Sequence, residues 1–311
     1  MYDNIRIIEV GPRDGFQNVK KFIPTEQKIE IAEALMNAGF EEMELTSFIS
    51  PKWIPQMADA AEVISELRHF QKEKGLKTVF AVLAPNPKGV ENASKCDIDC
   101  ISYPISVSER HNKENVNRTR EQSFEELAEL IKEHGNLDFT VGLATSFGSP
   151  YLGEEIKTDD VVRMAVKAFD VGATSVVVAD TVGNGNPDFV DKTLEALKGY
   201  VDFDKLHMHL HDTFGLSLTN TIIGLKHGIK VFESAAGGLG GCPFAPGAAG
   251  NVATEDVLNL FDLMGVKTTF EYDIKELYRG IGLIDKYVDA PIISHAYKFY
   301  ECNHAFKAEA K

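Results

Sequence analysis

Residues 205–234 read KLHMHLHDTFGLSLTNTIIGLKHGIKVFES, and this stretch contains one complete strand–helix–strand unit. A short apolar run at residues 205–210 predicts one strand, and a second run at residues 230–234 predicts another. Between them, residues 217–227 have the periodicity of an amphipathic helix, which we expect to stop at Gly228. A strand, a helix and a strand in this order are typical of a parallel β-sheet.

The same unit recurs along the whole chain. Apolar runs that predict strands occur at residues 6–10, 42–46, 78–83, 100–104, 138–144, 175–179, 205–210 and 230–234. The helical patterns between them include residues 25–38, 123–133, 158–171 and 187–198, and we expect Thr25, Ser123 and Thr158 to cap the first three. Because the units follow one another without a Pro/Gly/Ser-rich linker, the sequence predicts an α/β protein with a closed (β/α)8 TIM barrel rather than two domains. An open doubly wound sheet with extra strands is the alternative.

The C-terminal part of the chain carries two more helical patterns, at residues 274–287 and 292–300. We therefore predict a TIM-barrel catalytic domain at residues 1–268, followed at residues 269–311 by a short C-terminal helical extension that packs on the barrel. This extension would serve as a cap or as a contact in a homo-oligomer, for which we expect a dimer.

The composition is that of a globular protein with a sizeable core, because 44% of the 311 residues are apolar and 25% are charged. A net charge of −15 and scattered lysines argue against a nucleic-acid partner. No apolar run approaches the roughly 20 residues of a membrane helix, and no signal segment precedes the first strand, so we expect no membrane partner and a cytoplasmic location. The four cysteines, Cys96, Cys100, Cys242 and Cys302, are too few for a disulfide framework, which predicts reduced thiols.

Polar residues collect at the carboxyl ends of the predicted strands, where barrels of this kind have their active sites. Asp14 follows the first strand, and His209 and His211 share one face at the end of the seventh. Asn251, after the last strand, adds an amide oxygen across the closure of the barrel. Core hydrogen bonding is the other interpretation of a His-x-His pair, but the four groups together predict a divalent-metal site, for Mg²⁺ or Mn²⁺ in preference to Zn²⁺. His207, deeper in the barrel, is expected to serve packing or hydrogen bonding.

Two further residues have a chemical interpretation. Arg13, beside Asp14, is either part of a structural ion pair or a permanent charge that stabilises an enolate. The glycine-rich loop at residues 237–251 carries Cys242, which is either an incidental small residue or a thiol placed for proton transfer.

These motifs resemble the hydroxymethylglutaryl-CoA lyase family. The resemblance rests on EVGPRDGFQN (residues 9–18), SFISPKWIPQM (residues 47–57), HLHDTFG (residues 209–215) and the stretch at residues 237–255, and it extends over nearly the whole barrel. It implies a bound Mg²⁺ or Mn²⁺ and a retro-Claisen cleavage of an acyl-CoA substrate, 3-hydroxy-3-methylglutaryl-CoA or a similar thioester, to acetyl-CoA and acetoacetate or a related ketoacid.

By position, the resemblance assigns roles to individual residues. It implies that the metal is held by Asp14, His209, His211 and Asn251, that Arg13 and Cys242 are catalytic, and that Glu44, Asp180 and Glu255 occupy acidic positions near the centre. Of these acids, Glu44 is either catalytic or supporting, and the other two are supporting. Either Asp14 or a histidine beside the metal removes the hydroxyl proton of the substrate.

The fifth predicted strand departs from the family pattern. Where these lyases carry Arg-Gly-Tyr, this chain has Thr140-Val141-Gly142, so two large polar side chains are missing from one face. Two outcomes are open: the pocket accepts a larger or less polar group on C3 than methyl, or Tyr103 or Tyr151 refills the space and the specificity is unchanged.

Two alternatives remain at this point. An acetyl-CoA-dependent Claisen-condensing synthase of the isopropylmalate or homocitrate type resembles this chain in its barrel, its Arg-Asp-Gly loop and its His-x-His pair, but lacks the cysteine-bearing loop. The non-enzyme alternative is a barrel that retains its metal and serves as a binding protein, against which the intact set of site residues argues.

Overall fold

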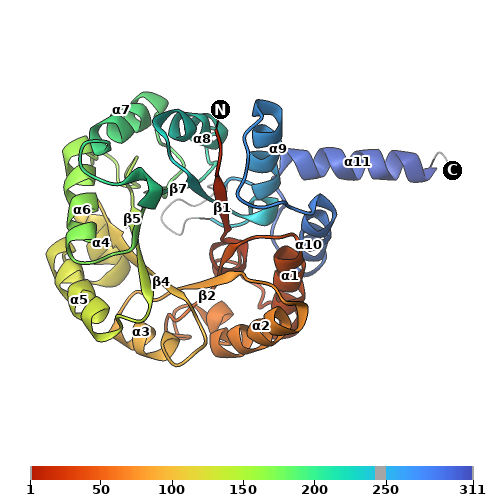
Figure 1. Cartoon of the computed structure of the whole chain (residues 1–311), viewed down its shortest axis with the longest axis horizontal. Coiled ribbons are helices and arrows are strands. Elements are labelled where there is room, and N and C mark those ends of the chain that lie inside the picture. The colour runs from red at the N-terminus through yellow and green to blue at the C-terminus, as the bar shows by residue number, and fades with distance from the viewer. Residues whose placement is uncertain (1, 242–249, 310–311) are drawn as a thin grey trace.

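The computed structural model describes residues 2–241 and 250–309, and its centre is a closed barrel of parallel strands in the order β1 to β8 (Figure 1). The predicted (β/α)8 TIM barrel is therefore confirmed. The strands are β1 (Arg6–Glu9), β2 (Glu42–Ser47), β3 (Val79–Leu83), β4 (Cys100–Ser106), β5 (Asp138–Ala144), β6 (Ser175–Asp180), β7 (Leu206–Leu210) and β8 (Val231–Ser234). All the predicted strands are present, with ends that differ by one or two residues at most.

Helices surround the barrel and cover the outer face of its sheet (Figure 1). They are α1 (Thr25–Asn37), α2 (Ala60–Lys74), α3 (Pro87–Ala93), α4 (Glu109–Val116), α5 (Arg120–Glu133), α6 (Thr158–Asp170), α7 (Pro187–Leu197), α8 (Ser217–His227), α9 (Thr254–Met264), α10 (Ile274–Tyr287) and α11 (His295–Glu309). The main hydrophobic core lies between strands and helices and includes Phe139, Val141 and Leu143 of β5. Because side chains alternate along a strand, the inward face of the barrel is left for other residues.

The expected helix caps are wrong. α5 begins at Arg120, before the predicted start, because Thr119 and Gln122 form a reciprocal capping box there. Thr25 and Thr158 are the first residues of α1 and α6, and neither helix has a side-chain cap at its start. These caps depend on backbone direction at the helix entry, which the spacing of apolar residues does not specify.

The chain beyond the last strand adds helices to the outside of the barrel. The backbone at residues 267–269 pairs with the start of the chain, since Ile5 N donates to Lys267 O at 3.0 Å and Thr269 N donates to Ile5 O at 2.9 Å. α10 packs against α1, and α11 projects away from the barrel (Figure 1). Tyr278 of α10 contacts Tyr300 of α11, with ring centroids 4.1 Å apart and ring planes tilted by 43°. The division of the chain at residues 268 and 269 stays a prediction.

Within the described ranges, no helix has both the length and the apolar character that crossing a membrane requires.

Candidate active site

Asp14 and Arg13 reach the mouth of the barrel through a tight backbone turn. After β1 the chain forms one π-helical turn, η1 (Gly11–Gly15), in which the N–H groups of Arg13 and Asp14 both donate to Val10 O, at 3.2 and 2.7 Å. π-helical turns are rare in proteins, and those that occur are frequently found at functional sites. This turn places two neighbouring side chains of opposite charge at the carboxyl end of the strand.

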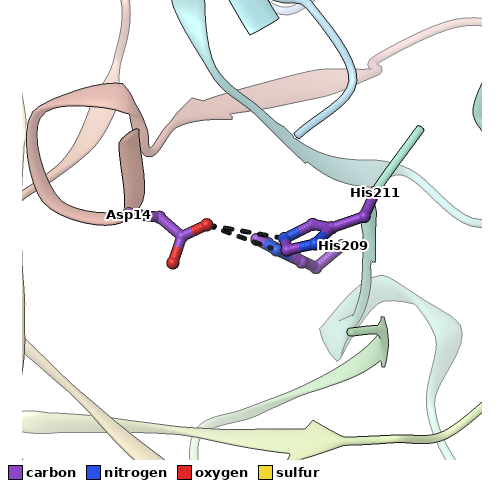
Figure 2. Close-up of side chains that lie close together, drawn as sticks. All are labelled: Asp14, His209 and His211. Carbon is purple, nitrogen blue, oxygen red and sulfur yellow. Dashed lines mark ion pairs between the residues drawn. The ribbon is translucent and has the colours of Figure 1, made fainter. Parts of the chain in front are cut away.

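The side chain of Asp14 faces His209, which is on β7, and His211, which comes directly after β7 (Figure 2). Asp14 Oδ2 lies 3.5 Å from His211 Nε2 and 4.0 Å from His209 Nε2. One ligand atom from each of the three residues lies within 4.8 Å of the others. Residues that are distant in the sequence are thus brought together at one end of the barrel.

Asn251 joins this group because the segment that carries it runs beside the end of β7. Asn251 and His211 form an antiparallel bridge, and Val252 N donates to Leu210 O at 2.9 Å. The side-chain Nδ2 of Asn251 donates to Asp14 Oδ2 at 2.6 Å. Gly240 permits this approach, because it has a φ of +120° and a Cβ there would lie 2.6 Å from Asn251 Nδ2.

The donor set fits a divalent cation. Asn251 Oδ1 is buried and has no hydrogen-bond partner within the described residues, so an acceptor is left for a ligand beside Asp14. Two imidazole nitrogens, a carboxylate oxygen and an amide oxygen can hold a divalent metal while leaving positions for substrate or water. These four residues are the ones for which the sequence predicted metal binding.

Arg13 lies between two carboxylates, and each of its contacts uses a different nitrogen. Its Nε donates to Glu44 Oε2, and its Nη1 donates to Asp14 Oδ1. Burial opposes the charge of Arg13, but Asp14 and Glu44 outweigh burial, so the pKa of the guanidinium is raised. Burial also acts against ionisation of Asp14, but Arg13 and the two nearby histidines hold its pKa well below its usual range. The two oxygens of Asp14 are therefore divided between Arg13 and the histidine side of the site.

Glu44 is buried on β2 and contacts Arg13. Burial raises the pKa of Glu44, while Arg13 opposes this shift. This contact gives Glu44 a way to orient the guanidinium.

The other two acids predicted near the centre shape loops of the mouth. Asp180, at the end of β6, accepts hydrogen bonds from the backbone N–H groups of Gly183, Asn184 and Gly185. Glu255, in the first turn of α9, accepts a hydrogen bond from Gly237 N at 3.1 Å, and burial raises its pKa to about 7. Both contacts fit the supporting interpretation. Cys242 lies outside the described residues.

The sequence interpretation missed Glu233, which lies on β8 directly across from His209 of β7. Its Oε2 is 2.8 Å from His209 Nδ1, and the two side chains are 12% and 10% exposed. The other carboxylate oxygen, Oε1, is 4.0 Å from Nδ1 of the deeper His207, whose pKa burial lowers to about 4. A carboxylate on one ring nitrogen of a histidine fixes the nitrogen that faces a metal.

Glu9 was also given no role from the sequence. It accepts hydrogen bonds from Gly11 N at 2.8 Å, from Ala236 N at 3.0 Å and from Thr254 Oγ1 at 2.6 Å, so it joins the first and last parts of the barrel. Burial raises the pKa of Glu9 to about 7. A signal was present for both missed residues, because a carboxylate inside a short apolar strand is rarely buried without a partner.

Comparison with known proteins agrees with this arrangement. A family model described as HMGL-like matches residues 4–281. The chain is 37% identical over 292 residues to a hydroxymethylglutaryl-CoA lyase of Bacillus subtilis, a match that covers 93% of this chain and 95% of that protein.

Solved structures give the same result. The crystal structure of a Bacillus subtilis HMG-CoA lyase matches with a TM-score of 0.88 and 35% identity, covering 96% of this chain and 98% of that one. An HMG-CoA lyase from Acinetobacter baumannii, in complex with coenzyme A and 3-methylmalate, matches with a TM-score of 0.86 and 32% identity, covering 95% and 94%.

Proposed function

Because this chain belongs to the HMGL-like family and is a carbon–carbon lyase of the hydroxymethylglutaryl-CoA lyase type, we propose that its substrate is 3-hydroxy-3-methylglutaryl-CoA or a similar thioester. The proposed products are acetyl-CoA and a ketoacid, which is acetoacetate for the methyl substrate. The observation that carries this proposal is the convergence of Arg13 and Asp14 with the two histidines and Asn251 at one end of the barrel. The relatives are named as lyases, so neither the condensing synthase nor the non-catalytic binding protein is favoured.

We propose that Asp14, His209, His211 and Asn251 hold the cation, and that it is Mg²⁺ or Mn²⁺. When bound, a divalent cation there would polarise the C3 hydroxyl of the substrate and make its proton easier to remove. Asp14 or a histidine beside it accepts that proton. The set contains a carboxylate and an amide oxygen, which favours these two metals over Zn²⁺.

Arg13 acts on the charge that appears when the C2–C3 bond breaks. The leaving group is the enolate of acetyl-CoA, whose negative oxygen needs a fixed positive partner. Glu44 and Asp14 use Nε and Nη1 of Arg13, so neither contact uses Nη2, which we assign to the enolate oxygen. Glu44 thereby acts as a positioning residue, and Cys242 is proposed to return a proton to C2.

The remaining expectations are also proposals. The complex of a relative with coenzyme A supports an acyl-CoA as the substrate class. The dimer and the cytoplasmic location expected from the sequence stay predictions.

The proposed function is tested with a panel of 3-hydroxy-3-methylacyl-CoA thioesters, by coupled detection of acetyl-CoA. Metal-stripped protein is assayed alone and after addition of Mg²⁺, Mn²⁺ or Zn²⁺. We expect release of acetyl-CoA with Mg²⁺ or Mn²⁺ and none in excess chelator. His209→Ala should lose metal retention, whereas the control His227→Ala, on α8 and paired with Asp191 at 2.8 Å, should keep it. Full turnover in chelator would contradict the metal requirement, and no release from any thioester would contradict the function.

A further inference from the structure

The two halves of the barrel interior are built from different kinds of side chain. The strands β2, β7 and β8 place ionisable residues there, namely Glu42, Glu44, His207, His209 and Glu233. His207 pairs with Val177 of β6, Val177 pairs with Gly142 of β5, and Gly142 pairs with Pro104 of β4. Because residues paired across neighbouring strands lie on the same face of a sheet, these residues share the inward face with His207. The inward residues of β3 to β6 are mostly small, although Leu83 pairs with Ser102; they include Ala81, Leu83, Cys100, Ser102, Pro104, Thr140, Gly142, Ala144, Ser175, Val177 and Ala179.

Small residues in this half leave space that a barrel of this size normally fills. The interior of an eight-stranded barrel is just wide enough to be packed by side chains, usually large branched ones. A Cβ added at Gly142 would meet no atom within 4 Å. Ser102, Pro104, Gly142 and Ala144 are also partly exposed, although they lie in strands that are covered by helices outside. We call the space bordered by these four residues the β4–β5 hollow.

The two tyrosines that would refill this space are held elsewhere. Tyr103 is buried in the outer core, and its hydroxyl donates to Glu126 of α5 at 2.5 Å. Tyr151 lies beyond the end of β5, where its hydroxyl donates to Glu114 of α4 at 2.6 Å and its ring lies under the guanidinium of Arg110. Neither side chain closes the β4–β5 hollow.

The β4–β5 hollow lies across the barrel from the residues that would act on the substrate. In the closed order β1 to β8, strand β5 is opposite β1, which leads to Arg13 and Asp14. A substituent of a carbon held beside Asp14 can therefore extend across the barrel interior toward the β4–β5 hollow. The four residues bordering the hollow carry no charge, and the only polar side chain among them is that of Ser102, whose hydroxyl donates a hydrogen bond to the Glu44 carboxylate.

We propose that the β4–β5 hollow receives an alkyl substituent on C3, and that the enzyme cleaves 3-hydroxy-3-alkylglutaryl-CoA esters with alkyl groups longer than methyl. This inference rests on the proposed function and specifies its substrate class. The reaction stays balanced, because a 3-butyl-3-hydroxyglutaryl-CoA gives acetyl-CoA and 3-oxoheptanoate by the same bond cleavage, with the hydroxyl proton lost and one proton added to C2. Gly142 is then a specificity-determining residue.

The experiment compares kcat/KM for 3-hydroxy-3-methylglutaryl-CoA and for the butyl analogue, in the metal-loaded enzyme and in three variants. Gly142→Ala and Gly142→Leu fill the hollow in steps, and a side chain is compatible with the backbone there because Gly142 does not have a positive φ. Gly199→Ala is the matched control, since a Cβ at Gly199 also meets no atom within 4 Å but lies after α7 at the other end of the barrel. Thermal unfolding checks that each variant is folded.

We expect the wild-type enzyme and Gly199→Ala to cleave the two substrates with kcat/KM values within about 10-fold of each other. Gly142→Leu should lower the value for the butyl substrate at least ~10-fold more than for the methyl substrate, with Gly142→Ala in between. A wild-type preference for methyl above ~10²-fold, or equal losses on both substrates in the folded Gly142 variants, would overturn this inference alone. If neither thioester released acetyl-CoA, both the proposed function and this inference would be wrong.

Discussion

Replacing Glu233 by Gln should weaken metal binding without unfolding the barrel. Glu233 Oε2 lies 2.8 Å from His209 Nδ1, and both side chains are largely buried, at 12% and 10% exposed. A carboxylate at Nδ1 fixes the proton there, so Nε2, the nitrogen that faces Asp14 at 4.0 Å, keeps its lone pair for a metal. Gln removes the charge and can present a donor instead of an acceptor.

The size of the effect follows from this single contact. A buried hydrogen bond to a charged group contributes about 1.5–3 kcal/mol, and each 1.4 kcal/mol is a factor of ten in affinity. We therefore expect Glu233→Gln to raise the Kd for Mn²⁺ by roughly 10- to 100-fold, which is the usual cost of losing a partner of a metal-binding histidine. Glu233→Asp should recover part of the loss.

The assay is a calorimetric titration of metal-stripped protein with Mn²⁺, which does not depend on turnover. Glu42→Gln is the matched control, because Glu42 is a similarly buried carboxylate inside the barrel but pairs with Arg6 at 3.1 Å. Its Kd should stay within about 3-fold of wild type. An unchanged Kd in folded Glu233→Gln, or an equal loss in the control, would refute the argument that the carboxylate acts by orienting His209.

Two further predictions concern the first βα unit. Arg13→Gln should lower kcat by at least ~10²-fold with little change in KM, because enolate charge appears only as the bond breaks; a large rise in KM at unchanged kcat would assign Arg13 to substrate binding. The pKa of Glu9 is raised from 4.5 to about 7, so between these pH values the folded protein holds a proton that the unfolded chain releases. The stabilisation of the folded state by this proton is therefore complete below pH 4.5 and is lost as the pH rises through 7. At about 1.4 kcal/mol per pKa unit, the free energy of unfolding of the wild type should fall by up to about 3 kcal/mol relative to Glu9→Gln over that pH range. Urea unfolding of both proteins at several pH values measures this difference, and an identical pH dependence in the two proteins would contradict the prediction.

The sequence by itself determined the barrel and the position of its active end. Strand and helix periodicities are local, so the eight strands were found with small errors at their ends. Parallel strands in a closed barrel end at the same rim, so polar residues after the first, seventh and eighth strands had to be neighbours once the barrel was recognised. For this reason Asp14, His209, His211 and Asn251 could be predicted to lie together before their geometry was known.

Only the tertiary structure decided how these groups are held and where the barrel is hollow. The pairing of Glu233 with His209 depends on the register between β7 and β8, and the contacts of Glu9 depend on how the last strand closes on the first. The open space at Gly142 depends on Tyr103 packing outward against α5. Register, closure and side-chain direction arise from packing between elements that are distant in the sequence, and no local pattern of residues specifies them.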